Sequence, residues 1–227
     1  MYCDVHTHRR GRSEFFSICS YDCSELLVLG CPPSFPNYPF SVGLHPYYLE
    51  TEVSASSRER LPEILRAPCC LAIGECGLDH SIEVGLPQQI SAFERQIFLS
   101  EEFSKPLILH IVGAWAELLS IRKDVRPTQP WIVHGFRKKP GLAEQLLAQG
   151  LYLSFGAEYN ADSLRLADEA GLRLCETDLS ELEIETVYDR HTTTLAIEPS
   201  EFAQRTLAAC SQIWSEGYIA SCLASEF

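Results

Sequence analysis

Histidines and carboxylates recur where apolar stretches of this chain end, and these side-chain types are the usual ligands of divalent metals. The first stretch reads DVHTH and carries Asp4, His6 and His8 at alternate positions. In a β-strand these three side chains point to the same face. A row of polar groups on a buried face costs free energy unless something binds it. Further candidates near the ends of later apolar stretches are His45, Glu75, His110, His134 and Asp178.

Four imidazoles with two carboxylates suit one or two divalent cations. Oxygen ligands favour magnesium or manganese, whereas several histidines favour zinc or manganese, so the ligand types leave the metal open. The metal would explain why the row at His6 and His8 is polar. Asp4, further back on the same face, either orients a ligand imidazole or is a hydrogen-bonded structural residue.

Strand-like stretches that alternate with amphipathic segments must position these residues. The strands are predicted at 2–8, 14–19, 40–45, 70–76, 106–111, 131–135, 151–155 and 172–178. Helices are predicted at 87–104, 139–149, 161–170, 183–195 and 199–216. Strands that alternate with helices form parallel sheets, and eight such units predict a compact (β/α)8 barrel of the TIM type. The strand ends would then converge on one mouth, where the candidate ligands meet.

A doubly wound sheet is the alternative, although the Gly-rich dinucleotide turn G-x-G-x-x-G is absent. The stretch 9–39 is irregular and its segment CPPSFPNYP is too rich in proline for a helix. We therefore expect the first helices of the barrel to be missing or reduced. No linker or repeat divides the chain, so residues 1–227 are expected to form one domain.

Composition narrows the classes of function. The formal net charge is −13, which argues against a protein that coats nucleic acid through a basic face but does not exclude local binding of a phosphate. No apolar run approaches the length of a membrane span, and no signal peptide is recognisable at the start. The ten cysteines include no C-x-x-C pair and are interpreted as free, mostly buried thiols. A cytoplasmic protein without membrane contact or an obligate protein partner is expected.

The motifs resemble one known family. DVHTH is similar to the D-x-H-x-H opening of the amidohydrolase superfamily. VGLHP, IGECGLD, PLILH, WIVHGF, LYLSFG and ETD then follow in the order seen in TatD-like metal-dependent deoxyribonucleases. The resemblance covers about residues 2–180 and continues more weakly beyond them. Each motif alone is weak, and the ordered set is specific.

The resemblance implies a hydrolase with two divalent metal ions (Mg, Mn or Zn). It implies that His6 and His8 bind the first metal, that Glu75 bridges both, and that His110 and His134 bind the second. It also implies that Asp178 binds the first metal and accepts the proton of the attacking water. Glu75 and Asp178 would thus be the catalytic carboxylates.

Three departures from the family pattern fall on the rim of the predicted mouth. Tyr47 stands where members commonly have a second histidine, basic residues follow His134, and the usual proline after Asp178 is missing. Arg137 and Lys138 would bind substrate phosphate, together with His45. A further basic cluster, Arg9, Arg10 and Arg12, follows the first strand.

We expect a metal-dependent phosphodiesterase, a 3′-5′ exonuclease acting on single-stranded DNA or short oligonucleotides, as the resemblance implies. The alternative within the enzymes is a hydrolase of a small amide, lactone or phosphate ester on the same metal centre. A barrel that has lost its substrate and serves as a scaffold is the alternative outside the enzymes, and the intact ligand set argues against it.

Overall fold

A computed structural model describes the backbone of residues 1–10, 12, 14–31, 35–50 and 52–224, and their side chains except those of 52–57 and 221–224. Within this part, every helix is too short or too polar to cross a membrane. Residues 32–34 of the proline-rich stretch lie outside the described residues.

The eight predicted strands are all present. They are β1 (Cys3–Thr7), β2 (Phe16–Asp22), β3 (Phe40–Gly43), β4 (Cys70–Asp79), β5 (Leu107–Val112), β6 (Trp131–Val133), β7 (Tyr152–Phe155) and β8 (Arg173–Cys175). They form one sheet in chain order, β1 to β8, and the strand pairs are parallel. This order with intervening helices is that of a (β/α)8 barrel, which confirms the predicted fold class.

The helices are α1 (Cys23–Val28), η1 (Pro46–Tyr48, a 3₁₀ turn), α2 (Glu52–Ile64), α3 (Leu86–Phe103), α4 (Trp115–Val125), α5 (Pro140–Ala148), α6 (Ala161–Glu169), α7 (Ile184–Leu195), α8 (Pro199–Trp214) and α9 (Glu216–Ala224). Between β1 and β2 the described residues contain no helix, and α1 has six residues. The expectation that the first helices are reduced is confirmed. The five predicted helices correspond to α3, α5, α6, α7 and α8.

The chain divides into two compact units. Unit 1 comprises Met1–Cys19 and Ile132–Phe227, and unit 2 comprises Ser20–Trp131. The expectation of one domain over 1–227 stays a prediction. The described cysteines are free, and all of them are buried except the partly exposed Cys69. Burial raises the pKa of the Cys70 thiol to about 12, so it behaves as a small apolar side chain.

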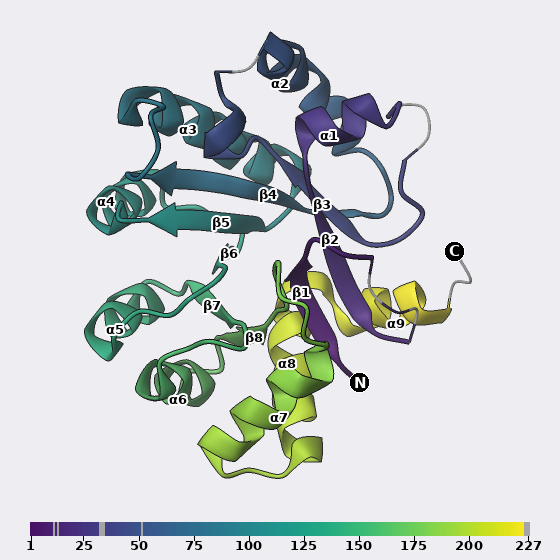
Figure 1. Ribbon diagram of the computed structural model, residues 1–227, viewed down its shortest axis with the longest axis vertical. Helices are drawn as coiled ribbons and strands as arrows, with labels where there is room; N and C mark the ends of the chain where they lie inside the picture. Colours follow the sequence, from purple (N-terminus) through teal and green to yellow (C-terminus); the bar gives the residue numbers. More distant parts are fainter. Residues whose placement is uncertain (11, 13, 32–34, 51, 225–227) are drawn as a thin grey trace. The chain divides into compact units, whose positions relative to one another are not determined.

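In unit 2, β4 lies beside β5, and α3 and α4 pack along these strands (Figure 1). Every residue of β4 is buried, as expected for a strand covered on both faces. Two glycines allow the strands to approach closely at the functional end. A Cβ on Gly43 would lie 2.4 Å from the carbonyl oxygen of Glu75, and one on Gly77 would lie 2.2 Å from that of His110. No larger residue fits either position without moving a strand.

In unit 1, the first strand meets the segment that follows the last strand. Thr7 and Asp178 form a parallel bridge, and the amide of Asp178 donates to the carbonyl of His6 at 3.0 Å. Helices α7 and α8 cover β8 through an apolar cluster that includes Cys175, Tyr188 and Phe202. Burying such side chains stabilises the unit by about 1.5–3 kcal/mol each. This packing holds the end of β8 against β1.

Candidate functional site

Unit 1 brings together His6, His8 and Asp178, a group that we call cluster one. The Nε2 atoms of His6 and His8 lie 3.5 Å and 3.6 Å from the same carboxylate oxygen, Oδ1 of Asp178. His6 is buried and His8 is about one-third exposed, so the cluster is reachable from one side. One possible ligand atom of each residue lies within 4.8 Å of the others. This spacing suits a single divalent cation.

Cluster one is held by its main chain. The amide of Asp178 donates to the carbonyl of His6, and the amide of His8 donates to the carbonyl of Asp178 at 3.2 Å. Asp178 has a φ of 52°, in the left-handed region, which typically costs a non-glycine residue about 1–3 kcal/mol. The two backbone hydrogen bonds fix this conformation. The three candidate ligands are thereby held by the main chain.

His134 and Glu176 lie against cluster one. The ring centroids of His6 and His134 are 4.3 Å apart, and His134, Glu176 and Asp178 again place donor atoms within 4.8 Å. Oε1 of Glu176 accepts from the amide of Gly135 at 2.6 Å and lies 3.9 Å from Nδ1 of His134. Oε2 of Glu176 is buried, and no described residue hydrogen-bonds it. Glu176 therefore fixes the turn that follows β6.

The sequence left two roles open for Asp4, and the structure shows the second one, a hydrogen-bonded structural residue. Its carboxylate accepts from the amide of Thr177 at 3.0 Å and from the Thr177 hydroxyl at 2.7 Å. Burial raises the pKa of Asp4 to about 7, although these hydrogen bonds act in the opposite direction. Asp4 thus anchors the segment between Glu176 and Asp178.

Unit 2 brings together His45, Glu75 and His110, which we call cluster two. Oε2 of Glu75 lies 3.6 Å from Nε2 of His45 and 3.5 Å from Nδ1 of His110. Their donor atoms also fall within 4.8 Å of one another. Nδ1 of His45 accepts from the amide of Tyr47 at 3.1 Å, so a neutral ring carries its proton on Nε2. A protonated nitrogen donates a hydrogen bond but does not bind a metal. The contact of His45 with substrate stays a prediction.

The sequence analysis missed Asp79, which orients His110. Oδ2 of Asp79 lies 3.0 Å from Nε2 of His110, and this pairing directs Nδ1 towards Glu75. Gln89 holds the backbone of Asp79 by accepting from its amide at 2.7 Å and donating to its carbonyl at 2.9 Å. Burial opposes ionisation of Asp79, but hydrogen bonds from Ser81 and His110 outweigh it and lower the pKa of Asp79. Period-two alternation from Glu75 could have identified Asp79.

The predicted rim residues fall on both units. Tyr47, on η1 of unit 2, is half-exposed, and its ring centroid lies 4.7 Å from that of His45. In unit 1, Arg137 and Lys138 are exposed, and Nη1 of Arg137 lies 3.4 Å from Oε2 of Glu158.

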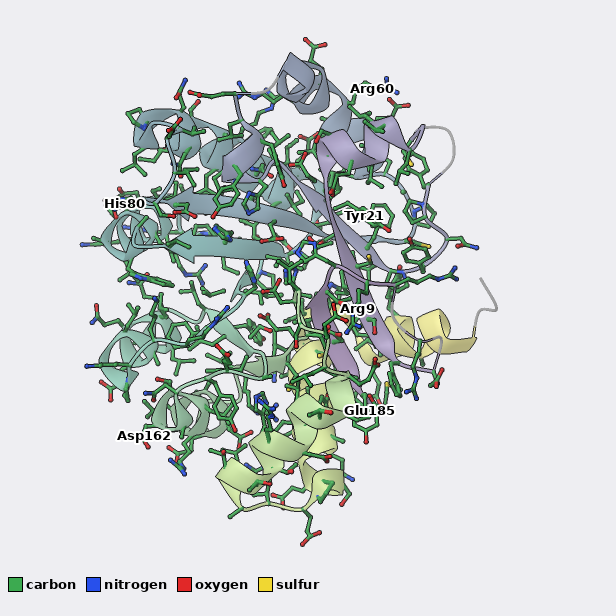
Figure 2. The ribbon with its side chains drawn as sticks, in the orientation of Figure 1. Arg9, Tyr21, Arg60, His80, Asp162 and Glu185 are labelled. Atoms are coloured by element: carbon green, nitrogen blue, oxygen red, sulfur yellow. The ribbon has the colours of Figure 1, made fainter. Side chains whose placement is uncertain are left out.

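The second basic cluster is largely engaged inside unit 1. Arg12 pairs with Glu14 and Glu185, and Arg9, beside β1 in Figure 2, donates to the carbonyl of Leu182 at 3.1 Å. These two arginines are therefore weaker candidates for substrate binding than Arg137.

The donor set fits a divalent metal. Cluster one combines two histidine nitrogens with a carboxylate within 4.8 Å, and in cluster two Nδ1 of His110 lies 3.5 Å from the Glu75 carboxylate. Such a mixture suits zinc or manganese best. The ligands are positioned by hydrogen bonds that do not involve the metal-facing atoms, as in established metal sites. The structure thus contains candidate His/Glu/Asp metal groups.

The chain matches the family model "TatD related DNase" over residues 22–216. The 3′-5′ ssDNA/RNA exonuclease TatD of Erwinia amylovora is 36% identical over 118 residues, which are 51% of this chain and 45% of the relative. The human 3′-5′ RNA nuclease TATDN2 is 38% identical over 87 residues, or 37% of this chain and 11% of the relative. The chain matches less than half the length of these curated relatives.

Two solved structures share the fold. YJJV, a TatD homologue from Escherichia coli, superposes with a TM-score of 0.76 at 23% identity and covers 89% of this chain and 86% of its own. A TatD-family hydrolase from Entamoeba histolytica gives a TM-score of 0.66 at 16% identity, with 89% and 85% coverage. Likeness at this identity establishes the α/β barrel.

Proposed function

Because the chain belongs to the TatD-related DNase family, we propose that it is a metal-dependent 3′-5′ exonuclease acting on single-stranded DNA or RNA. The observation that carries the proposal is cluster one, where two imidazoles and a carboxylate oxygen converge within 4.8 Å. The matched relatives, a 3′-5′ ssDNA/RNA exonuclease and a 3′-5′ RNA nuclease, support the substrate class.

We propose two divalent cations for this activity. His6, His8 and Asp178 would hold one, and Glu75 and His110 would hold the other. The further roles of Glu75 as a bridge and of His134 as a ligand of the second cation rest on the family resemblance alone. When bound, such cations polarise the phosphodiester and lower the pKa of a water molecule.

The side chains of the site would transfer the proton and bind the substrate. Asp178 would accept the proton of the attacking water, because its carboxylate is one-quarter exposed and its backbone is fixed. Arg137 and Lys138 would bind substrate phosphate, and the Nε2 proton of His45 would donate to the substrate or to Glu75. Asp79 would keep the lone pair of His110 on Nδ1.

The test is a nuclease assay on single-stranded oligonucleotides labelled at the 5′ or the 3′ end, with magnesium, manganese or zinc. We expect stepwise shortening from the 3′ end, loss of activity in EDTA, and loss in Asp178→Asn. A panel of small amides, lactones and phosphate esters is assayed for hydrolysis in parallel. Turnover of a panel member without oligonucleotide cleavage would favour the alternative hydrolase, and no turnover with any metal would favour a scaffold. The cytoplasmic location and the absence of an obligate protein partner stay predictions.

A further inference from the structure

A cavity of about 500 Å³ opens beside cluster one in unit 1. Asp178 and Glu176 line it, together with the loops that follow β6 and β7. Its size falls within the range of small-ligand sites, about 300–1,000 Å³. Because the proposed base is part of its wall, whatever fills the cavity would lie next to the reacting group.

Two arginines from different elements reach this cavity. Arg137 comes from the loop after β6 and Arg190 from α7. Nη1 of Arg190 donates to the carbonyl of Ala157 at 3.1 Å, and Nη1 of Arg137 lies 3.4 Å from the carboxylate of the next residue, Glu158. Both guanidinium groups thus contact neighbouring residues of the loop that follows β7, and both line the cavity.

Most of the donors of both arginines stay available. A guanidinium group has five N–H donors, and within the described part of the chain each of these two groups makes a single hydrogen bond. Both side chains are exposed, so their remaining donors face solvent. Two guanidinium groups match the oxygens of a phosphate, which arginine binds through parallel hydrogen bonds.

The charges around the cavity affect which ligands Arg137 and Arg190 can bind. The chain carries a formal charge of −13, and three carboxylates, Glu158, Glu176 and Asp178, line the same cavity. An anion would be repelled here unless cations compensate for the carboxylates. Arg137 and Arg190 offset two of the three negative charges among the described residues that line this cavity.

We propose that Arg137 and Arg190 form a clamp for the substrate phosphate adjacent to the one that is cleaved. This inference rests on the proposed nuclease function: a phosphate next to the one cleaved at Asp178 would meet Arg137 and Arg190 if it enters the cavity that these residues share. Arg190 lies outside the resemblance to the family motifs and is assigned here from the cavity alone. It would make the enzyme discriminate charged from neutral backbones.

The experiment compares kcat/KM on two single-stranded oligonucleotides. One has natural linkages throughout, and the other has an uncharged methylphosphonate at the linkage next to the cleaved one. We expect the wild-type protein to prefer the natural strand by about ten-fold, which corresponds to about 1.4 kcal/mol. Arg190→Ala should cut this preference to about two-fold, mainly through KM, and Arg190→Lys should fall between.

Arg165→Ala is the matched control. Arg165 is an exposed arginine of unit 1 that pairs with Asp162 at the start of α6 (Figure 2) and does not line the cavity. It should keep the wild-type preference. A methylphosphonate four linkages away should affect no variant.

The possible results distinguish a failure of the proposed clamp from a failure of the proposed nuclease function. If the wild-type protein cleaves neither strand, the proposed function fails and the clamp fails with it. If it cleaves both equally, or if Arg190→Ala keeps the full preference, the clamp alone is overturned. Inhibition by inorganic phosphate that requires Arg190, without any preference between the strands, would assign the cavity to free phosphate and also overturn the clamp.

Discussion

Clusters one and two contain the same kinds of ligand but hold them differently. In cluster one, backbone hydrogen bonds between His6, His8 and Asp178 set the positions of the ligands. In cluster two, His110 is oriented by the side chain of Asp79, which in turn depends on Gln89. Backbone positioning tolerates changes in neighbouring side chains, whereas side-chain positioning does not. We therefore expect substitutions around the ligands to matter far more in cluster two.

Substitution of the candidate ligands themselves should lower activity most. Two variants at cluster one, Asp178→Asn and Glu176→Gln, give the clearest comparison. Asp178→Asn removes the proposed base and should lower kcat by at least 10²- to 10⁴-fold in saturating metal. Glu176→Gln keeps an oxygen that can accept from the amide of Gly135 and should cost far less. Single-turnover rates of both variants decide between them. A dead Glu176→Gln variant beside an active Asp178→Asn variant would transfer the base role to Glu176.

Unit 1 buries His191, whose own contribution to stability depends on pH. Nε2 of His191 lies 3.0 Å from the carbonyl oxygen of Gly156. Burial lowers the pKa of His191 from 6.5 to about 3. The unfolded chain therefore binds a proton at His191 that the folded chain does not, and the contribution of His191 to stability falls as the pH drops below 6.5. Between pH 7 and pH 4 this loss is about 3 kcal/mol. Asp4, whose pKa is raised, contributes in the opposite direction.

His191→Gln should remove most of that pH dependence. Urea unfolding of both proteins at pH 7 and pH 4 measures it, and proton binding by other groups cancels in the difference. His80→Gln is the control, because His80, labelled at the end of β4 in Figure 2, is 43% exposed and belongs to unit 2. Equal acid losses in wild type and His191→Gln would show that His191 does not carry the effect.

Asp79→Asn tests side-chain positioning directly. Asparagine can present its NH₂ group to Nε2 of His110, which would favour the ring tautomer with the proton on Nδ1, the wrong nitrogen for a metal. We expect a loss of 10- to 100-fold in affinity for one cation, measured by titration of the metal-free protein. Asp4→Asn is the equivalent change beside cluster one and should cost a few-fold at most. Equal losses in the two variants would remove the contrast between the clusters.

The strands and the candidate metal-binding groups could be predicted from the sequence because they obey local rules. Each strand is a short apolar run, and a parallel arrangement brings polar residues at strand ends to the same side. Helix α4 was not predicted, because its last turns are charged and include Lys123 and Asp124. These residues obscure the apolar pattern of the rest of the helix. The predicted strand 172–178 is shortened to Arg173–Cys175, since Asp178 adopts a left-handed conformation that alternation cannot foresee.

Orienting residues are harder to predict than ligands. Asp79 shares a strand face with Glu75, but only the fold shows that its partner is His110. Arg190 looks like any arginine on a solvent-exposed helix until α7 is placed beside the loop that follows β7. Such roles depend on contacts between segments that are far apart in the sequence. The periodicity of apolar residues gives no information about these contacts.

The smallest expected effect separates the two basic residues that follow His134. Arg137 lines the cavity beside cluster one, whereas Lys138 does not, and the backbone carbonyl of Lys138 is occupied by the hydroxyl of Ser163 at 2.7 Å. An exposed lysine that meets phosphate only through solvent contributes about 0.2–1 kcal/mol, so Lys138→Ala should raise KM for a short oligonucleotide two- to four-fold at low salt. The increase should vanish near 0.5 M salt, where the Debye length falls to a few ångströms. Arg137→Ala should raise KM more and keep part of its effect in salt, and both variants should bind metal as the wild type does. A Lys138→Ala effect that equals that of Arg137→Ala and persists in high salt would place Lys138 in direct contact with the substrate.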